Sequence, residues 1–264
     1  MMRPSVAVAS FGYHEVTDDP ASAGFQRPGA HPYKHTRDAF MRDLDAIAAG
    51  PCPPERATDV DLSSPGRHVF LTFDDGGKSA SWIADALAAR GWKGHFFIVT
   101  GLVGTRTFLT AQEIIHLRQC GHAVGSHSDT HPDIFREQPF DRMVEEWRIS
   151  RDRLAQLLGE PCTTASVPGG DISPLVLESA DRAGLSYLFT SEPVLRPVRV
   201  GACWVLGRFI PKAWTPAARI GELAAFRGWR SALLVRQLKG AARRVFPQLY
   251  RQYVYRTTRP EGHP

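Results

Sequence analysis

Two short segments carry side chains suited to hydrolytic chemistry. The first, Asp74-Asp75-Gly76, places two adjacent carboxylates directly after an apolar, strand-like run. Adjacent carboxylates can divide the work of a site, because one can bind a cation while the other takes up a proton. Asp and Gly also favour plain turns, so this tripeptide alone leaves a turn without chemistry open.

The second segment, His127-Ser-Asp-Thr-His131-Pro132, contains two histidines four residues apart. This spacing can present both imidazoles to one side of a single turn, which suits a metal ion. Serine follows His127 where an HExxH protease has glutamate, so that class is disfavoured. Asp75 would complete a two-histidine, one-carboxylate site with positions open for water and substrate. Incidental loop histidines are the alternative.

A different grouping of the same residues uses His127 and Asp129 with a distant histidine. This is the ligand order of some non-haem iron oxygenases. Those enzymes are mostly double-sheet jelly rolls, whereas strands alternate with helices here, so this grouping is disfavoured.

Apolar runs of strand length alternate with segments of helical periodicity. Because parallel strands need crossover connections, this alternation predicts an α/β barrel of about seven parallel strands. Both polar segments follow predicted strands, where such a barrel has its active-site loops. The predicted strands are 6–11, 68–73, 95–99, 123–126, 163–167, 186–190 and 203–209, and the predicted helices are 36–49, 82–91, 110–121, 140–158 and one that begins at 173.

The C-terminal part of the chain differs in pattern and charge. No strand signal remains between Trp214 and Tyr255, and two or three basic helices are predicted there. From Lys212 onward eleven Lys or Arg stand against two acids, a net charge of +9, whereas residues 1–211 carry −4. We therefore divide the chain into a barrel, 1–211, and a basic helical extension, 212–264. Such an extension suits an anionic membrane surface or a phosphate group better than nucleic acid, and a solvated cationic helix face is the alternative.

Composition excludes several classes of protein. With 43% hydrophobic and 22% charged residues, the chain is neither disordered nor fibrous. No apolar run reaches the roughly 18 residues of a membrane span or resembles a signal-peptide core, so we expect a cytoplasmic protein, with membrane association left open. The four cysteines lie too far apart for a metal knuckle or a disulfide framework, and no phosphate-binding glycine loop is present.

The two polar segments resemble the first two motifs of the polysaccharide deacetylases, the NodB-homology group or carbohydrate esterase family 4. The segments are Thr72-Phe-Asp-Asp-Gly76 and, some fifty residues later, His127-Ser-Asp-Thr-His131-Pro132, and the likeness extends over roughly residues 5–210. The resemblance implies a distorted (β/α) barrel with a divalent metal, usually zinc, with cobalt or nickel as alternatives. Such enzymes remove acetyl groups from N-acetylated sugars.

By position, the resemblance implies that Asp74 is the catalytic base and that Asp75, His127 and His131 bind the metal. Most relatives carry a late histidine that protonates the leaving amine, but here Arg208 stands at that place. Gly12-Tyr-His14-Glu-Val16 resembles the Tyr-His segment of the biofilm-polysaccharide deacetylases, whose motif order is circularly permuted. Because barrel closure brings the first and last strands together, we assign the general acid to His14, with a surface histidine as the alternative.

A further departure lies at Ser166-Val-Pro168-Gly169, where many relatives have Arg-x-Pro-Tyr. Ser166 replaces the arginine that orients the catalytic aspartate, and Arg208 is the candidate to hold Asp74 instead. A backbone N–H survives any side-chain change, so Gly169 remains a candidate oxyanion donor. We group Gly169, Pro168 and Arg208 as oxyanion- or substrate-binding residues, with a simple turn as the alternative.

These features predict a metal-dependent hydrolase that removes N-acetyl groups from a glycan or glycan precursor. One alternative keeps the site but acts on a lipid-linked sugar or a small amide. Another is a non-catalytic carbohydrate-binding barrel that has lost the arginine and the late histidine of its relatives. The presence of both Asp74 and His14 favours an enzyme.

Overall fold

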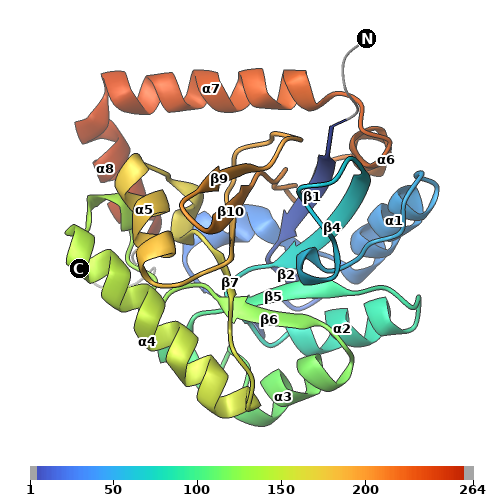
Figure 1. The fold of residues 1–264 in the computed structure, drawn as a ribbon, viewed down its shortest axis with the longest axis horizontal. Coiled ribbons are helices and arrows are strands. Elements are labelled where there is room, and N and C mark those ends of the chain that lie inside the picture. Colours follow the sequence, from blue (N-terminus) through green and yellow to red (C-terminus); the bar gives the residue numbers. More distant parts are fainter. Residues whose placement is uncertain (1–4, 259–264) are drawn as a thin grey trace.

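The computed structural model describes residues 5–258 and contains one eight-stranded sheet that curls into a half-barrel (Figure 1). Seven strands run parallel in the order β1-β4-β5-β6-β7-β8-β10, and β9 joins the edge antiparallel to β10. The predicted α/β barrel of about seven parallel strands is therefore confirmed. The strands are β1 (Ala7–Tyr13), β4 (Arg67–Phe73), β5 (Gly94–Ile98), β6 (Ala123–Ser126), β7 (Thr164–Ser166), β8 (Tyr187–Phe189), β9 (Val198–Val200) and β10 (Cys203–Leu206).

The curl of the sheet brings β1 back to the segment that follows β10. The Gly12 N–H donates to the Phe209 carbonyl at 2.9 Å, and the Phe209 N–H donates to the Ser10 carbonyl at 2.9 Å. These bonds pair Phe11 with Phe209 in a parallel bridge. The loops after the first and the last parallel strands therefore meet at one end of the barrel.

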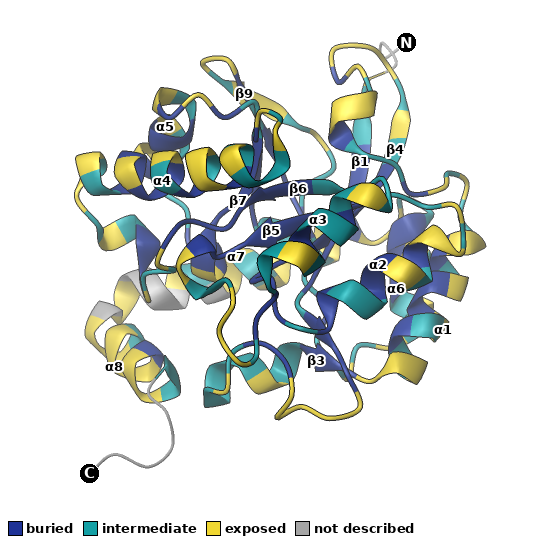
Figure 2. Cartoon of the chain, turned by 90° about the horizontal axis from the view of Figure 1, so that it is seen from below, coloured by how far each residue is buried: buried dark blue, intermediate teal, exposed yellow. Residues whose placement is uncertain are grey.

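Helices surround the sheet, and the strands and inward helix faces form the buried core (Figure 2). The α-helices are α1 (Arg37–Ala48), α2 (Ala80–Ala88), α3 (Ala111–Gln119), α4 (Phe140–Leu158), α5 (Pro174–Arg182), α6 (Ala217–Ala224), α7 (Trp229–Val245) and α8 (Pro247–Thr258). Short 3₁₀ helices are η1 (Pro28–Tyr33), η2 (Ala57–Asp59), η3 (Thr100–Leu102), η4 (Phe135–Glu137) and η5 (Pro168–Gly170). The last three α-helices confirm the predicted helical character of the C-terminal part.

Local sequence signals explain where several helices begin. Thr110 accepts a hydrogen bond from the Glu113 N–H, and the Glu113 carboxylate accepts one from the Thr110 N–H, so α3 has the predicted capping box. Ser173 accepts from the Val176 N–H and Pro174 occupies the first turn of α5. Each cap satisfies helix-start amides that would otherwise have no partner.

The sequence patterns missed three short strands, β2 (Glu15–Val16), β3 (Lys34–His35) and β9. Strand β9 has two exposed residues and one half-buried residue, so it carries no apolar alternation. Strands β2 and β3 form a separate two-stranded sheet and are too short to show a period. Among the described residues, no helix combines the length and apolar character needed to cross a bilayer.

A buried carboxyl beside the first strand should make stability depend on pH. The Tyr13 hydroxyl donates to Asp43 Oδ2 at 3.1 Å, and both side chains are buried. Burial raises the pKa of Asp43 to about 6, against the smaller lowering effects of Tyr13 and Arg42. Between about pH 4 and pH 6, Asp43 therefore stays protonated in the native state but loses its proton in the unfolded state. The free energy of unfolding falls as the pH rises through that range.

The Asp43→Asn variant should lack this loss, because an amide keeps an acceptor for Tyr13 without a charge. We expect it to be more stable than the parent by on the order of 2 kcal/mol at about pH 8, and little changed at about pH 4, in urea unfolding. The exposed Asp45→Asn variant on the same helix is the control. An equal gain at both pH values would contradict the assignment.

Candidate active site

The predicted polar segments meet at the carboxyl ends of the parallel strands. Asp74 and Asp75 follow β4, and the Asp74 N–H donates to the Tyr13 carbonyl at the end of β1 at 2.9 Å. His127 follows β6, and its N–H donates to the Ile98 carbonyl at the end of β5 at 2.9 Å. Neighbouring strands thus hold these residues at the rim where barrels carry active-site loops.

Asp75, His127 and His131 come together as a candidate metal site. Asp75 Oδ1 lies 3.3 Å from His127 Nε2 and 3.7 Å from His131 Nε2. One donor atom from each residue lies within 4.8 Å of the other two. Two imidazole nitrogens and one carboxylate oxygen form a donor set that suits zinc and similar divalent ions, with further positions open.

The backbone at this site is held in unusual conformations. Asp75, Ser128 and His131 have φ angles of 75°, 63° and 52°, the left-handed region that residues other than glycine rarely adopt. The turn is fixed by serine side chains, because the Ser128 hydroxyl accepts from the His131 N–H at 3.0 Å. Such conformations cost roughly 1–3 kcal/mol each and cluster at functional sites. The fold therefore tolerates strained backbone at the residues that carry the candidate metal-binding side chains.

Contacts behind the histidines orient their rings. His127 Nδ1 lies 3.0 Å from the Ser166 carbonyl, which can only accept, so Nδ1 carries the proton and Nε2 is left facing Asp75. His131 Nδ1 lies 3.4 Å from a guanidinium nitrogen of Arg27, a residue that the sequence patterns did not single out. The stronger partner of Arg27 is Asp133, at 2.9 Å.

The charges of the site favour a bound cation. Burial opposes ionisation of Asp75, but its hydrogen bond with His127 and the nearby His14 hold its pKa below the usual range. Burial and then the charge of His127 lower the pKa of His131 to about 3. Burial also opposes protonation of His127, yet the Asp74 and Asp75 carboxylates outweigh it and raise that pKa. The result is an anionic carboxylate and a neutral imidazole facing a position where positive charge is favoured.

Arg208 holds Asp74 in a buried bidentate ion pair. Its Nη1 donates to Asp74 Oδ1 at 2.8 Å and its Nη2 to Asp74 Oδ2 at 2.9 Å. The Ser166 hydroxyl donates to Asp74 Oδ2 at 3.1 Å and accepts from Arg208 Nη2 at 2.7 Å. Burial alone would raise the pKa of Asp74, but Arg208 and then His127 hold it below its ordinary value. Asp74 is therefore ionised at neutral pH.

This placement corrects the grouping of Arg208 with substrate-binding residues. The guanidinium is fully buried, donates also to the Thr72 hydroxyl and the Thr190 carbonyl, and does not line the cavity beside Asp74. Arg208 lies behind Asp74, so its position is that of a residue that orients the carboxylate. Pro168 is likewise buried and is not among the residues that line the cavity.

A cavity of about 440 Å³ opens beside the site. Asp74, His127, His14 and Gly169 line it together. His14 packs its ring 5.0 Å from that of Tyr33, and its buried Nδ1 has no hydrogen-bond partner within residues 5–258. The curl of the sheet thus places a residue after the first strand in the same cavity as residues after β4, β6 and β7.

The C-terminal helices supply a wall of this cavity. Ala232, Val235 and Arg236 of α7 and Tyr253 of α8 line it, and so does Lys212. The sequence patterns treated this region as an appended unit and did not connect it with the site. The switch in charge at Lys212 was the available signal, but charge alone does not indicate which surface a helix covers.

A second group of metal-binding residue types lies on the surface, away from the cavity. His116 Nε2 of α3 is 2.8 Å from Asp85 Oδ1 of α2 and 3.5 Å from Cys120 Sγ. Any count of bound metal must therefore separate the two groups. The remaining cysteines are free thiols, of which Cys162 and Cys203 are buried.

Comparisons with known proteins agree with the fold and the motifs. The family model for polysaccharide deacetylase matches residues 61–188, which include Asp74, Asp75, His127 and His131. Residues 61–188 therefore match a polysaccharide deacetylase domain, and this match supports hydrolysis of N-acetyl groups on a glycan. Comparison with curated protein sequences finds no significant match.

Solved structures of deacetylases have the same fold. Streptococcus pyogenes deacetylase PplD in complex with acetate is 19% identical with a TM-score of 0.67, over 83% of this chain and 99% of that one. IcaB from Ammonifex degensii is 22% identical with a TM-score of 0.67, over 84% and 98%. A de-N-acetylase from Aggregatibacter actinomycetemcomitans is 16% identical with a TM-score of 0.69, over 82% and 99%. At these identities the likeness concerns the fold.

Proposed function

We propose that this protein is a metal-dependent N-deacetylase of a glycan or glycan precursor. The observation that supports this best is the position of an ionised Asp74 beside the donor set of Asp75, His127 and His131, in a cavity shared with His14. A site with a base, a metal-binding set and a second proton carrier suits hydrolysis of an amide. The polysaccharide deacetylase domain favours the N-acetyl group as that amide.

The three donors fit a divalent ion, because their reactive atoms converge and His127 Nδ1 is already tied to a carbonyl. Asp75, His127 and His131 would hold zinc, or cobalt or nickel in its place. When bound, such an ion supplies Lewis-acid polarisation of the amide carbonyl and makes water more acidic.

Asp74 would accept the proton of the attacking water. A carboxylate offers about four lone-pair positions. Arg208 Nη2 and Ser166 occupy two on Oδ2, whereas Arg208 Nη1 is the one donor to Oδ1 among the residues that the structure describes. Oδ1 therefore keeps a position for water. As the water oxygen bonds to the carbonyl carbon and the C–N bond breaks, acetate leaves and the sugar amine must receive a proton.

His14 is the group that we assign to protonate that amine. It lines the cavity, and its likeness to the Tyr-His segment of the permuted deacetylases supports the assignment. Gly169 lines the same cavity, and its backbone N–H is our candidate oxyanion donor.

Removal of the imidazole should slow turnover without loss of metal. For His14→Ala we expect kcat on N-acetylated oligosaccharides to fall roughly a hundredfold, the lower end of what a general acid contributes. The control is His68→Ala, because His68 lies near the opposite end of β4. An unchanged kcat in His14→Ala would remove the general acid from this position.

Activity itself can be tested by acetate release from N-acetylglucosamine oligomers. The protein is stripped with a chelator and then given zinc, cobalt or nickel, and bound metal is counted in parallel. We expect one metal per chain at the site and recovery of acetate release. Metal binding without hydrolysis of any N-acetylated sugar would favour the non-catalytic carbohydrate-binding barrel.

A further inference from the structure

The large exposed apolar side chains of this protein are concentrated on its C-terminal helices. Of the eleven large hydrophobic residues that are exposed in the described chain, eight lie between positions 234 and 255. The eight are Leu234, Val235, Leu238, Val245, Phe246, Leu249, Tyr253 and Tyr255. Monomeric proteins seldom gather apolar surface in this way unless it binds something.

Helical geometry places part of this set in one row. Leu234, Leu238, Ala241 and Val245 follow an i, i+4, i+7, i+11 spacing along α7, and all four are exposed. Leu238 is the more exposed of the two leucines, with 64% of its surface accessible to solvent. We call these four residues the α7 row.

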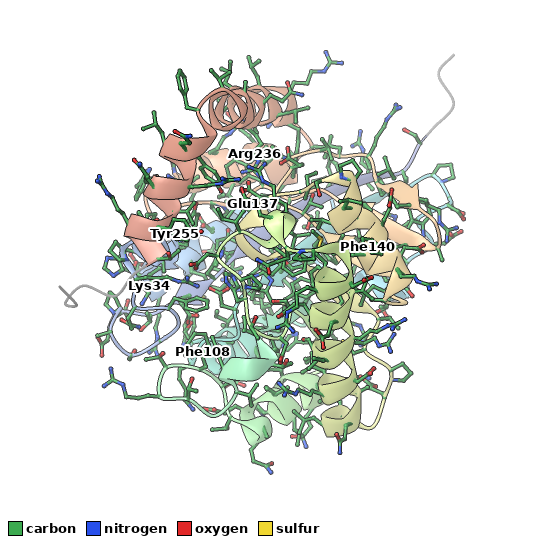
Figure 3. All side chains as sticks on the ribbon, turned by 90° about the vertical axis from the view of Figure 1, so that its left-hand side faces the viewer. Lys34, Phe108, Glu137, Phe140, Arg236 and Tyr255 are labelled. Atoms are coloured by element: carbon green, nitrogen blue, oxygen red, sulfur yellow. The ribbon has the colours of Figure 1, made fainter. Side chains whose placement is uncertain are left out.

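The inner side of the helix pair is already occupied by the barrel. Arg236 Nε bonds Glu192 at 2.8 Å, and Arg251 of α8 pairs with Glu137 at 3.2 Å. Figure 1 shows α7 running along one edge of the molecule. In Figure 3 this helix is seen end-on, with Arg236 beneath it. These contacts fix which side of α7 faces the barrel, so the α7 row points outward.

Basic residues accompany the apolar row. Arg230 and Arg256 are exposed, and residues 212–264 as a whole carry a net charge of +9. A surface that is both apolar and cationic suits the interface of an anionic bilayer, where apolar side chains enter the acyl region and cations meet headgroups. Two copies of the chain would cover the apolar row too, but they would bring like charges together.

We propose that α7 and α8 form a docking surface for an anionic membrane. The cavity supports this assignment, because Val235, Arg236 and Tyr253 of the same helices line its wall. Lys212, which also lines the cavity, lies 5.0 Å over the exposed ring of Trp214, and tryptophan is a residue typical of membrane interfaces. Docking through the α7 row therefore brings the cavity close to the lipid headgroups.

The docking surface also narrows the substrate. An enzyme held in this way acts on an N-acetylated glycan that is attached to a membrane lipid, and this step rests on the proposed deacetylase function. Membrane binding itself does not depend on catalysis, so the two can be tested separately.

Vesicle flotation of the full chain tests the surface. The probes are vesicles of phosphatidylcholine alone and of phosphatidylcholine mixed with phosphatidylglycerol. We expect binding to the mixed vesicles only, weakened by salt, and roughly a hundredfold weaker for a Leu234→Glu, Leu238→Glu double variant. The matched control is Leu175→Glu with Val198→Glu, two exposed apolar residues outside the helix pair.

Acetate release from soluble oligomers should be the same in both double variants, because none of the four residues lines the cavity. If the parent protein hydrolyses soluble oligomers but ignores mixed vesicles, the docking surface is wrong and the proposed function stands. If the parent protein binds mixed vesicles but hydrolyses no N-acetylated sugar, the docking surface stands and the proposed function is wrong. A third outcome is that the parent protein self-associates in light scattering and does not bind vesicles. If the Leu234→Glu, Leu238→Glu variant abolishes that self-association, the α7 row binds a second copy of the chain and not a membrane.

Discussion

Asp74→Asn is expected to lower kcat roughly a thousandfold while metal stoichiometry stays at the parent value, because a general base contributes about 10²–10⁴ to the rate. The amide keeps the shape of the carboxylate but cannot take a proton from water. Asp74 does not belong to the donor set of Asp75, His127 and His131. The measurement is steady-state acetate release with metal analysis of the same samples, and Asp38→Asn on the exposed side of α1 is the control.

Asp74→Asn is also expected to lower the stability of the protein, because Asp74 has a buried ion-pair partner. Asp74→Asn leaves the fully buried Arg208 guanidinium without its counter-charge, and breaking a buried pair costs about 3–5 kcal/mol. Asp74→Asn combined with Arg208→Met removes both charges, so it should recover part of that stability and none of the activity. Recovery of activity in the double variant would show that folding, and not proton transfer, limited the single one.

Arg208→Met alone distinguishes orientation from structural support. Arg208 lowers the pKa of Asp74, so its loss leaves burial as the dominant influence and raises that pKa. A base works in its ionised form, and the acidic limb of the pH–rate profile should therefore move to higher pH. If Arg208 had only a structural role, Arg208→Met would reduce the amount of folded enzyme and leave the acidic limb of the pH–rate profile unchanged.

Asp75→Ala is expected to abolish both metal binding and hydrolysis. Loss of an outer partner of a metal ligand already costs 10–100-fold in affinity, so loss of the ligand itself should exceed about a hundredfold. Asp75 has a φ of 75°, and asparagine tolerates this conformation better than alanine does. Asp75→Asn is therefore the second variant, with the backbone turn preserved and the charge removed.

Metal counting for these variants needs a control for the surface group. His116→Ala removes the histidine between Asp85 and Cys120 and leaves the cavity intact. We expect it to keep one metal per chain and full acetate release. Metal-dependent hydrolysis at the parent rate in Asp75→Ala would sink the assignment of the metal site.

Local patterns predicted most of the barrel because the information needed was local. The period of the apolar residues marked the strands, and α4 spans residues 140–158 as predicted. The donor set followed from the same logic, since parallel strands end at one rim and short loops bring Asp75 and the histidines together. Strands β2 and β3 were missed because two residues carry no period, and β9 was missed because it is mostly exposed and has no apolar alternation.

The amino-acid sequence by itself predicted the alternation of parallel strands and helices along the chain, the positions of Asp74 and Asp75 after β4, and the histidine pair after β6. The sequence offered Arg208 as a candidate partner of Asp74, but only the tertiary structure decided the bidentate contact and the part of Ser166 in it. It also decided that α7 and α8 wall the cavity. Asp74 and Arg208 are 134 residues apart. Their contact depends on how far the whole sheet curls. For α7 and α8, the helical period indicates which face of a helix is apolar but not which surface of the protein that face contacts. Long-range packing, and not any local pattern, sets both.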